Sequence, residues 1–287
     1  MELLVVGGET RLDRTKSLIY FEGLGNSLEF GVADDVLAAT KRDRVQHPFL
    51  EDLYNWSKSI YHFRFGSNLG KDRFVRSLDD IKVDGDFSMK TTEEVLEAFL
   101  RGEKIVTDFE QIVRADMERI GYKLESIGPE KVQFLPINIF GLAVKEADLW
   151  TNTHQFDMSQ GMFRALSLLI QLNLSLAIKT PSCILIDDIG EGLDFDRSKS
   201  LIALIIEKVK GSKVQLIMTT NDRFVMNNVP IEYWCVIQRK GNQSLFYNYK
   251  NSKATFDEFV YTGLNNFDFF ATGFFEKGFE EFTASAK

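Results

Sequence analysis

The 287-residue sequence contains few of the residues that build disulfide frameworks and metal sites. It holds two cysteines, Cys183 and Cys235, which lie 52 residues apart, and three histidines that show no ligand spacing. This scarcity argues against a disulfide scaffold and against a zinc site. A chain of this length buries a sufficient core without such links. We therefore expect two buried thiols in a reducing compartment, the cytoplasm.

The sequence also lacks a long hydrophobic run and an excess of positive charge. No uninterrupted stretch of 18 apolar residues occurs, and no basic segment precedes the apolar residues 3–6. These absences argue against a membrane span and against a signal peptide. Lysine and arginine number 34 against 42 acidic residues, which gives a net charge of −8. This balance argues against a wholly basic nucleic-acid-binding surface and leaves a local basic groove open.

Apolar and charged residues are present in the proportions of a globular protein. Apolar residues make up 44% and charged residues 26% of the chain, so the chain has enough apolar surface to fold. Phenylalanine is abundant: nine of the 25 lie in residues 256–282. We interpret residues 251–287 as a docking segment that packs on its own domain, with a partner-binding surface as the alternative.

The first 121 residues divide into two predicted parts. Residues 1–34 read as short strands of an antiparallel meander, at residues 3–6, 17–21 and 28–32, which would form the N-terminal part of a larger lobe. Residues 35–121 read as a mostly helical insert. One helix is predicted from a capping box of Thr91 and Glu94, and a second ends at Gly121.

Residues 122–250 show a different alternation of elements. Strands are predicted at residues 132–135 and 137–145. Continuous apolar strands then alternate with helices, which indicates a parallel sheet covered on both faces. The predicted elements are helix 159–179, strand 183–186, helix 196–210, and strands 214–218, 234–239 and 245–249.

Two acids follow the most apolar of these strands. Residues 183–186 are apolar, and Asp187 and Asp188 come directly after them. Ligands of parallel sheets bind at the carboxyl ends of the strands. Two carboxylates at that edge are typical of a site for magnesium and phosphate. An acid that caps the following helix is the alternative.

Three segments around these acids carry a resemblance to a known family. Residues 183–194 resemble the Walker B strand and D-loop of ABC-class P-loop ATPases. Residues 158–166 resemble the signature motif of that class, with Ser159 as a helix N-cap. Residues 215–222 resemble the strand that carries the switch histidine. The order and spacing of the three are most similar to those of the SMC/RecF/OLD-like branch.

The resemblance implies a fold, a ligand and an assembly. The implied fold class is α/β: an ABC-ATPase-like lobe with a parallel sheet flanked by helices, an antiparallel strand-rich lobe and a helical insert. Residues 122–250 would form the ATPase core. The implied ligands are ATP and Mg2+. The implied partner is a second copy or an ATPase partner chain, bound through the signature and D-loop face. The helical insert would contact an effector protein or nucleic acid.

The resemblance also assigns roles at and after the Walker B strand. Asp187 would hold the water shell of magnesium. Asp188 stands where the family has a glutamate that polarises the attacking water, and its shorter side chain implies slow hydrolysis. Asp194 would line the dimer interface. Asn221 replaces the switch histidine, and its amide can donate a hydrogen bond without titrating.

Four residues of the signature segment receive roles in the same way. Ser159, Gln160 and Gly161 would contact the γ-phosphate of ATP held by a second subunit, because a helix N-terminus favours anions. Arg164 lies one helical turn further on. It would either reach that phosphate or pair with a local acid.

One element of the family is absent from the sequence. The pattern Gly-x-x-x-x-Gly-Lys-[Ser/Thr], which cradles phosphates, does not occur. The nearest approach, residues 66–72, is one residue short and ends in Asp72, so we interpret it as a loop. Three explanations stay open: a phosphate loop upstream of Met1, a loop supplied by another polypeptide, or a degenerate relative that does not hydrolyse ATP.

The sequence therefore predicts an ATP-binding and ATP-hydrolysing dimerising switch. The family resemblance places it in bacterial antiphage defence or in DNA repair. A non-hydrolysing scaffold subunit, or half of a split ATPase, is the alternative.

Overall fold

The computed structural model describes residues 2–33, 35–41, 43–78, 92–133, 138–179 and 182–285. The chain forms two compact units. Residues 1–61 with 181–183 make up the first unit, and residues 62–180 with 184–287 make up the second. The boundaries predicted at residues 34, 121 and 250 do not coincide with this division.

The first unit contains the antiparallel meander that the sequence predicts, together with one strand that it does not. The four strands pair in the order β1-β2-β3-β4. Leu12 and Ile19 face each other across β2 and β3 and form a core with Ala38 and Leu50. Its strands and helix are β1 (Leu3–Val6), β2 (Glu9–Asp13), β3 (Leu18–Phe21), β4 (Asn26–Glu29) and α1 (Glu51–Lys58).

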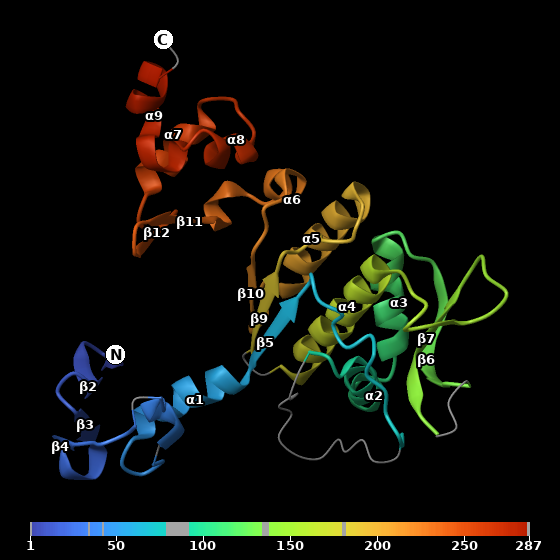
Figure 1. The fold of residues 1–287 in the computed structure, drawn as a ribbon, viewed down its shortest axis with the longest axis horizontal. Coiled ribbons are helices and arrows are strands. Elements are labelled where there is room, and N and C mark those ends of the chain that lie inside the picture. The colour runs from blue at the N-terminus through green and yellow to red at the C-terminus, as the bar shows by residue number, and fades with distance from the viewer. Residues whose placement is uncertain are drawn as a thin grey trace. The chain divides into compact units, whose positions relative to one another are not determined.

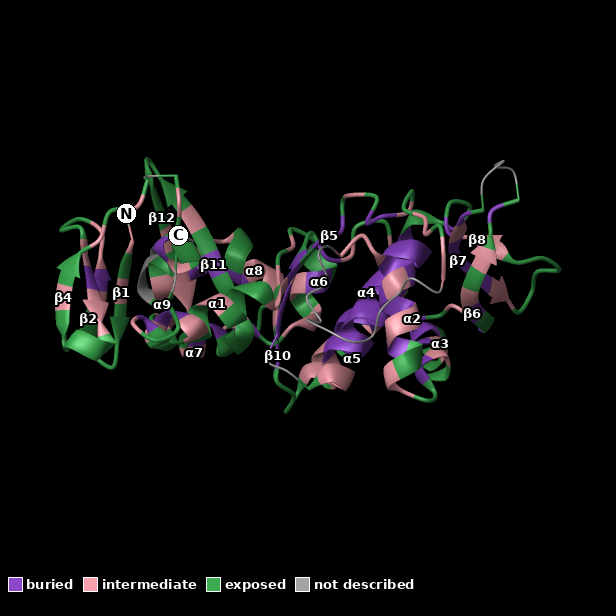
Figure 2. Cartoon of the chain, turned by 90° about the horizontal axis from the view of Figure 1, so that it is seen from below, coloured by how far each residue is buried: buried purple, intermediate pink, exposed green. Residues whose placement is uncertain are grey.

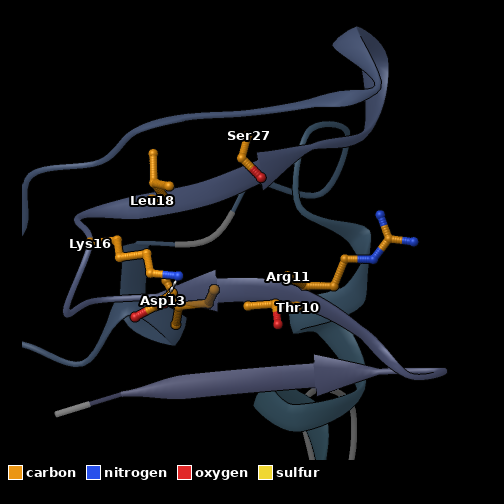
Figure 3. A pocket seen from close by; sticks show the side chains of 7 residues that line it. Thr10, Arg11, Asp13, Lys16, Leu18 and Ser27 are labelled. Atoms are coloured by element: carbon orange, nitrogen blue, oxygen red, sulfur yellow. Dashed lines mark ion pairs between the residues drawn. The ribbon is translucent and has the colours of Figure 1, made fainter.

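A pocket of about 190 Å³ lies on this meander (Figure 3). Its charged side chains are already engaged by neighbours. Lys16 pairs with Asp13 at 3.6 Å, and Arg11 pairs with Glu9 at 2.8 Å and lies on the ring of Tyr20. Such internally paired charges give no convergent set of donors for a ligand, so the candidate site is not built here.

The second unit contains the parallel sheet, in the order β10-β9-β5 (Figure 1). The N–H of Phe65 donates to Asp187 and the N–H of Cys183 donates to Ser59, so β5 and β9 run in the same direction. Along the unit lie β5 (Ile60–Arg64, which begins in the first unit), α2 (Val95–Ile105), α3 (Phe109–Arg119), β6 (Leu124–Lys131), β7 (Phe140–Glu146), β8 (Thr153–His154), α4 (Gln160–Ile178), β9 (Ser182–Asp187), α5 (Phe195–Val209), β10 (Val214–Met218), α6 (Arg223–Asn228), β11 (Cys235–Lys240), β12 (Gln243–Asn248), α7 (Lys253–Val260), α8 (Asn266–Ala271) and α9 (Phe274–Ser285).

The sheet is covered on both faces only at β9. Cys183 and Ile184, which point to opposite faces of that strand, are both fully buried. The edge strand β10 instead exposes Gln215 and 45% of Ile217. The prediction of a sheet covered on both faces therefore fails at β10, because Gln215 and Ile217 point to the same face and both are exposed.

Helix α4 is the central element of the second unit and is buried along nearly its whole length (Figure 2). Its length and hydropathy meet the criteria for a membrane span, but 83% of the qualifying window is buried inside the protein. Burial on all sides is typical of the core helix of a globular unit. Helices α2, α3 and α5 pack against it.

The structure differs from the sequence prediction at several elements. Strand β5 lies within the segment predicted as helical. Residues 124–131 form β6, where a strand was predicted at 132–135 instead. Helix α2 begins at Val95, later than the predicted capping box implies, and Thr91 of that box lies outside the described residues.

The C-terminal part of the second unit has its own aromatic core. Five phenylalanines of the Phe-rich segment are buried there with Trp234, Tyr247 and Tyr249 packed against them: Phe256, Phe259, Phe269, Phe274 and Phe275. Cys235 is exposed, and the prediction of two buried thiols is therefore wrong for this residue. It lies on the outward face of the β11–β12 hairpin, opposite Asn248.

Candidate functional site

The carboxyl ends of β9 and β10 meet at one edge of the parallel sheet, and Asp187 and Thr219 join them. The Thr219 hydroxyl donates to Asp187 Oδ1 at 2.6 Å, and the Asp188 N–H donates to the same hydroxyl at 3.1 Å. Both aspartates are exposed. Two solvent-facing carboxylates at the carboxyl edge suit a hydrated divalent cation, which needs oxygen ligands.

A tight loop leads from this edge to α5. Asp188 has a φ of +54°, a left-handed conformation that aspartate tolerates better than most residues. Gly190 and Gly192 follow with φ of +96° and +82°, where glycine carries no steric cost. Asp194 ends the loop and caps α5, because its Oδ1 accepts the Arg197 N–H at 2.9 Å. We refer to these residues as the 188–194 loop.

Asp194 is held as an anion in this position. The Arg197 N–H, and then the Arg197 guanidinium at 2.5 Å, lower the pKa of the Asp194 carboxyl below its usual value. A charged acid at the first turn also interacts favourably with the helix dipole.

The predicted signature segment opens α4 against the same loop. Ser159 is the N-cap, and its Oγ accepts the Met162 N–H at 3.2 Å. A Cβ on Gly161 would lie 2.3 Å from the carbonyl oxygen of Gly192, closer than real Cβ atoms approach backbone. The absence of a side chain at Gly161 therefore allows the N-terminus of α4 to touch the 188–194 loop. Gln160, the first residue of α4, is exposed beside it.

Arg164 makes the local contact that was one of its two predicted alternatives. Its Nη1 donates to the carbonyl oxygen of Glu191 at 2.9 Å and lies 4.0 Å from the Glu191 carboxylate. Arg164 is 4% exposed, so its guanidinium contacts the 188–194 loop from the protein interior.

Asn221 follows the edge residue Thr219 by two positions and is exposed. Asp222 next to it caps α6, accepting the Phe224 N–H at 2.6 Å. The structure therefore places Asn221 in the connection that leaves the carboxyl edge.

Residues 66–71, interpreted as a loop, form a loop that reaches the same edge. It follows β5, and a Cβ on Gly66 would lie 2.6 Å from the Glu191 carboxylate. Lys71 is engaged elsewhere, since its Nζ donates to the Met158 carbonyl oxygen. Sequence reasoning missed that this loop lies close to the 188–194 loop. The aromatic residues Tyr61, Phe63 and Phe65 occur at every second position, which is a strand signal that could have located β5, and all three are buried.

Two further residues border Ser159 and Asp194 and were not identified from the sequence. The Arg197 guanidinium lies 4.4 Å from the ring centre of Tyr122. Burial raises the pKa of the Tyr122 phenol, while the charge of Arg197 and the nearby Ser159 hydroxyl act in the opposite direction. No motif marks Tyr122 in the sequence, because it reaches the site from the end of α3.

Among the residues that the structure describes, no group of three or more His, Cys, Asp or Glu side chains is arranged to hold a metal ion.

No family model matches the chain. In sequence, the chain is similar to the DNA replication and repair protein RecF of Lachnoclostridium phytofermentans, with 26% identity over 187 residues, 63% of this chain and 47% of that protein. The chain thus spans about half the length of the relative that it matches.

Solved structures resemble the chain only weakly. A structure from work on ATP-driven dimerization and DNA-stimulated activation of SMC ATPases has 17% identity and a TM-score of 0.40, covering 52% of this chain and 87% of that one. The Smc head bound to the C-winged helix domain of ScpA has 18% identity and a TM-score of 0.43, covering 64% and 54%. Likeness at this level establishes neither a shared fold nor a shared function.

Proposed function

We propose that the second unit is an ATPase lobe that works by closing on a second nucleotide-binding subunit. The observation that carries this proposal is the packing of the α4 N-terminus against the 188–194 loop. This contact gathers residues from two separate sequence motifs, Ser159 and Asp194, at the carboxyl edge that also holds Asp187.

The residues of the edge have distinct roles in this proposal. Asp187 binds the water shell of magnesium, with Thr219 fixing its orientation, and Asp188 polarises the attacking water. Asn221 donates a hydrogen bond to a phosphate oxygen. The nucleotide would supply the phosphoryl group that water attacks, and the metal would balance its negative charge. The residues of the edge orient both.

The residues of the α4 N-terminus serve the other subunit. Ser159, Gln160 and Gly161 present N–H groups and a helix dipole to the γ-phosphate of ATP held there. Asp194 lies at the interface. Arg164 holds the loop in place and does not contact phosphate, because its guanidinium is buried.

An exposed apolar pair favours an interface on this face. Phe195, which begins α5, and Phe224 of α6 are 47% and 44% exposed, and their rings meet edge to face at 4.9 Å. Exposed aromatic side chains beside a polar site are typical of contact surfaces. The partner in this proposal is a second copy or an ATPase partner chain.

The phosphate loop is the component that this proposal leaves to another segment. Lys71 is bonded to Met158, so the 66–71 loop does not offer its lysine to phosphate. A polypeptide segment other than residues 66–71 supplies the loop. A degenerate, non-hydrolysing scaffold is the remaining alternative.

The likeness to RecF favours DNA repair over antiphage defence as the setting. The RecF relative is a DNA replication and repair protein. The proposed cytoplasmic location agrees with such a role.

Hydrolysis by an Asp188→Asn variant tests the enzymatic part of this proposal. An amide cannot accept a proton from water, so we expect the rate to fall at least about 100-fold, in line with the contribution of general bases. The matched control is Asp148→Asn, an exposed acid in the β7–β8 turn, which should keep the wild-type rate. Equal rates for wild type and Asp188→Asn, or no hydrolysis by the wild type even with a polypeptide that carries a phosphate loop, would favour the scaffold.

A further inference from the structure

Arg197 and Tyr122 connect the predicted dimer face to the helical part of the chain. Arg197 lies in the first turn of α5, and Tyr122 comes shortly after the end of α3. One guanidinium makes three contacts: Nη1 with the Asp194 carboxylate at 2.5 Å, its face with the Tyr122 ring at 4.4 Å, and Nη2 with the Gly121 carbonyl oxygen at 3.5 Å. An arginine held by a carboxylate and an aromatic face has a fixed plane, which a lysine cannot reproduce.

Tyr122 extends this set of contacts to α4. The nearby Ser159 hydroxyl acts to lower the pKa of its phenol, against the larger effect of burial, and Asp194 belongs to the loop that the N-terminus of α4 touches at Gly161. We name Tyr122, Ser159, Asp194 and Arg197 the Tyr122 cluster. It contains the N-cap residues of both α4 and α5. A movement of the N-terminus of either helix therefore changes the contacts of Tyr122.

One partly buried ion pair also joins α3 to α5, because Lys208 pairs with Asp116 at 2.6 Å. The pair of Arg119 with Glu207 at 2.6 Å is exposed and adds little. Arg197 and Lys208 therefore join α3 to the first and the last turn of α5. A displacement of α5 therefore moves α3 with it, because packed helices shift as rigid elements.

We propose that Tyr122 and Arg197 are positioning residues that couple the Ser159–Asp194 face to α3. This inference rests on the proposed function, since it assumes that nucleotide is bound at that face. In the closed state the Tyr122 cluster holds Ser159 and Asp194 in register with each other. Through Gly121 and Tyr122, a displacement of the cluster moves α3, which contacts the effector.

The test measures two quantities on the whole chain. Mass photometry gives the Mg–ATP concentration at half-maximal dimer formation, and hydrogen exchange gives the ATP-dependent protection of amides in α3. Three variants separate the contacts. Arg197→Lys keeps the charge and loses the planar stack, Tyr122→Leu loses ring and phenol, and Tyr122→Phe keeps the ring alone. Arg119→Gln is the matched control, because it breaks an α3–α5 contact away from Ser159.

Arg197→Lys and Tyr122→Leu should raise the required ATP concentration about five-fold or more, the usual size of a coupling effect, and abolish the protection of α3. Tyr122→Phe should raise the concentration but retain the protection, a separation that general destabilisation does not produce. Arg119→Gln should stay within about two-fold of wild type, since exposed ion pairs contribute little.

Wild-type behaviour of Arg197→Lys and Tyr122→Leu overturns this inference alone. A wild type that neither dimerises nor gains protection with ATP, alone or with a polypeptide that carries a phosphate loop, overturns the proposed function and this inference with it.

Discussion

Replacing Gly161 by alanine tests the contact that builds the candidate site. The new Cβ would lie 2.3 Å from the Gly192 carbonyl oxygen, whereas real Cβ atoms keep at least 3.0 Å, so helix or loop must retreat by 0.7 Å. Overpacking of this kind costs about 1–3 kcal/mol. The better helix propensity of alanine offsets up to about 1 kcal/mol. We expect a net loss of up to about 3 kcal/mol in the free energy of unfolding.

The functional effect of Gly161→Ala should exceed its effect on stability. A retreat of 0.7 Å separates the α4 N-terminus from the 188–194 loop, and misplacement on that scale is costly for a site built from both. Urea unfolding measures the first quantity and ATP-dependent dimer formation the second. Gly128→Ala is the matched control, because no atom lies within 4 Å of its added Cβ. A Gly161→Ala protein that dimerises with ATP as the wild type does would refute the reasoning.

Two predictions concern stability alone. Burial lowers the pKa of His47, whose ring nitrogens have no hydrogen-bond partner among the described residues. As the pH falls, the imidazole is therefore protonated in the unfolded chain before it is protonated in the folded chain. The free energy of unfolding should thus decrease below a pH of about 6.5. Amide exchange in β3 at pH 7.5 and 5.5 measures this, and a pH response that His47→Leu does not reduce would contradict it. Asp116→Ala should lower the free energy of unfolding by about 2–3 kcal/mol, because it leaves the partly buried Lys208 without its carboxylate. Glu207→Ala, which breaks the exposed pair with Arg119, should cost less than about 1 kcal/mol in the same urea titration; equal losses for the two variants would refute the assignment.

The sequence predicted the elements around the acids well because local signals are strong there. Ser159 was predicted as a helix N-cap, and the structure confirms this cap. Asp194 also caps its helix, although the sequence reasoning assigned it only to the dimer interface. The apolar run before Asp187 is long enough to define β9. The helix 159–179 and the strand 214–218 were predicted within a residue or two of α4 and β10.

Most of the remaining features depend on tertiary contacts that a pattern does not contain. Strand β5 is the exception, because Tyr61 and Phe63 alternate with His62 and Arg64; it was missed because the whole segment was interpreted as helical. Tyr122 and the 66–71 loop join the candidate site only through the packing of α3 and β5. Arg164 was assigned two roles because sequence spacing does not reveal burial.

The central claim is that Ser159 and Asp194 form a face that acts on nucleotide. Calorimetric titration of Mg–ATP into the purified chain, with mass photometry on the same sample, tests it most directly. The account predicts that ATP binding and dimer formation appear together, either in the chain alone or once a polypeptide that carries a phosphate loop is added. Dimers that form equally well without ATP, and a chain that binds no ATP under either condition, would contradict it.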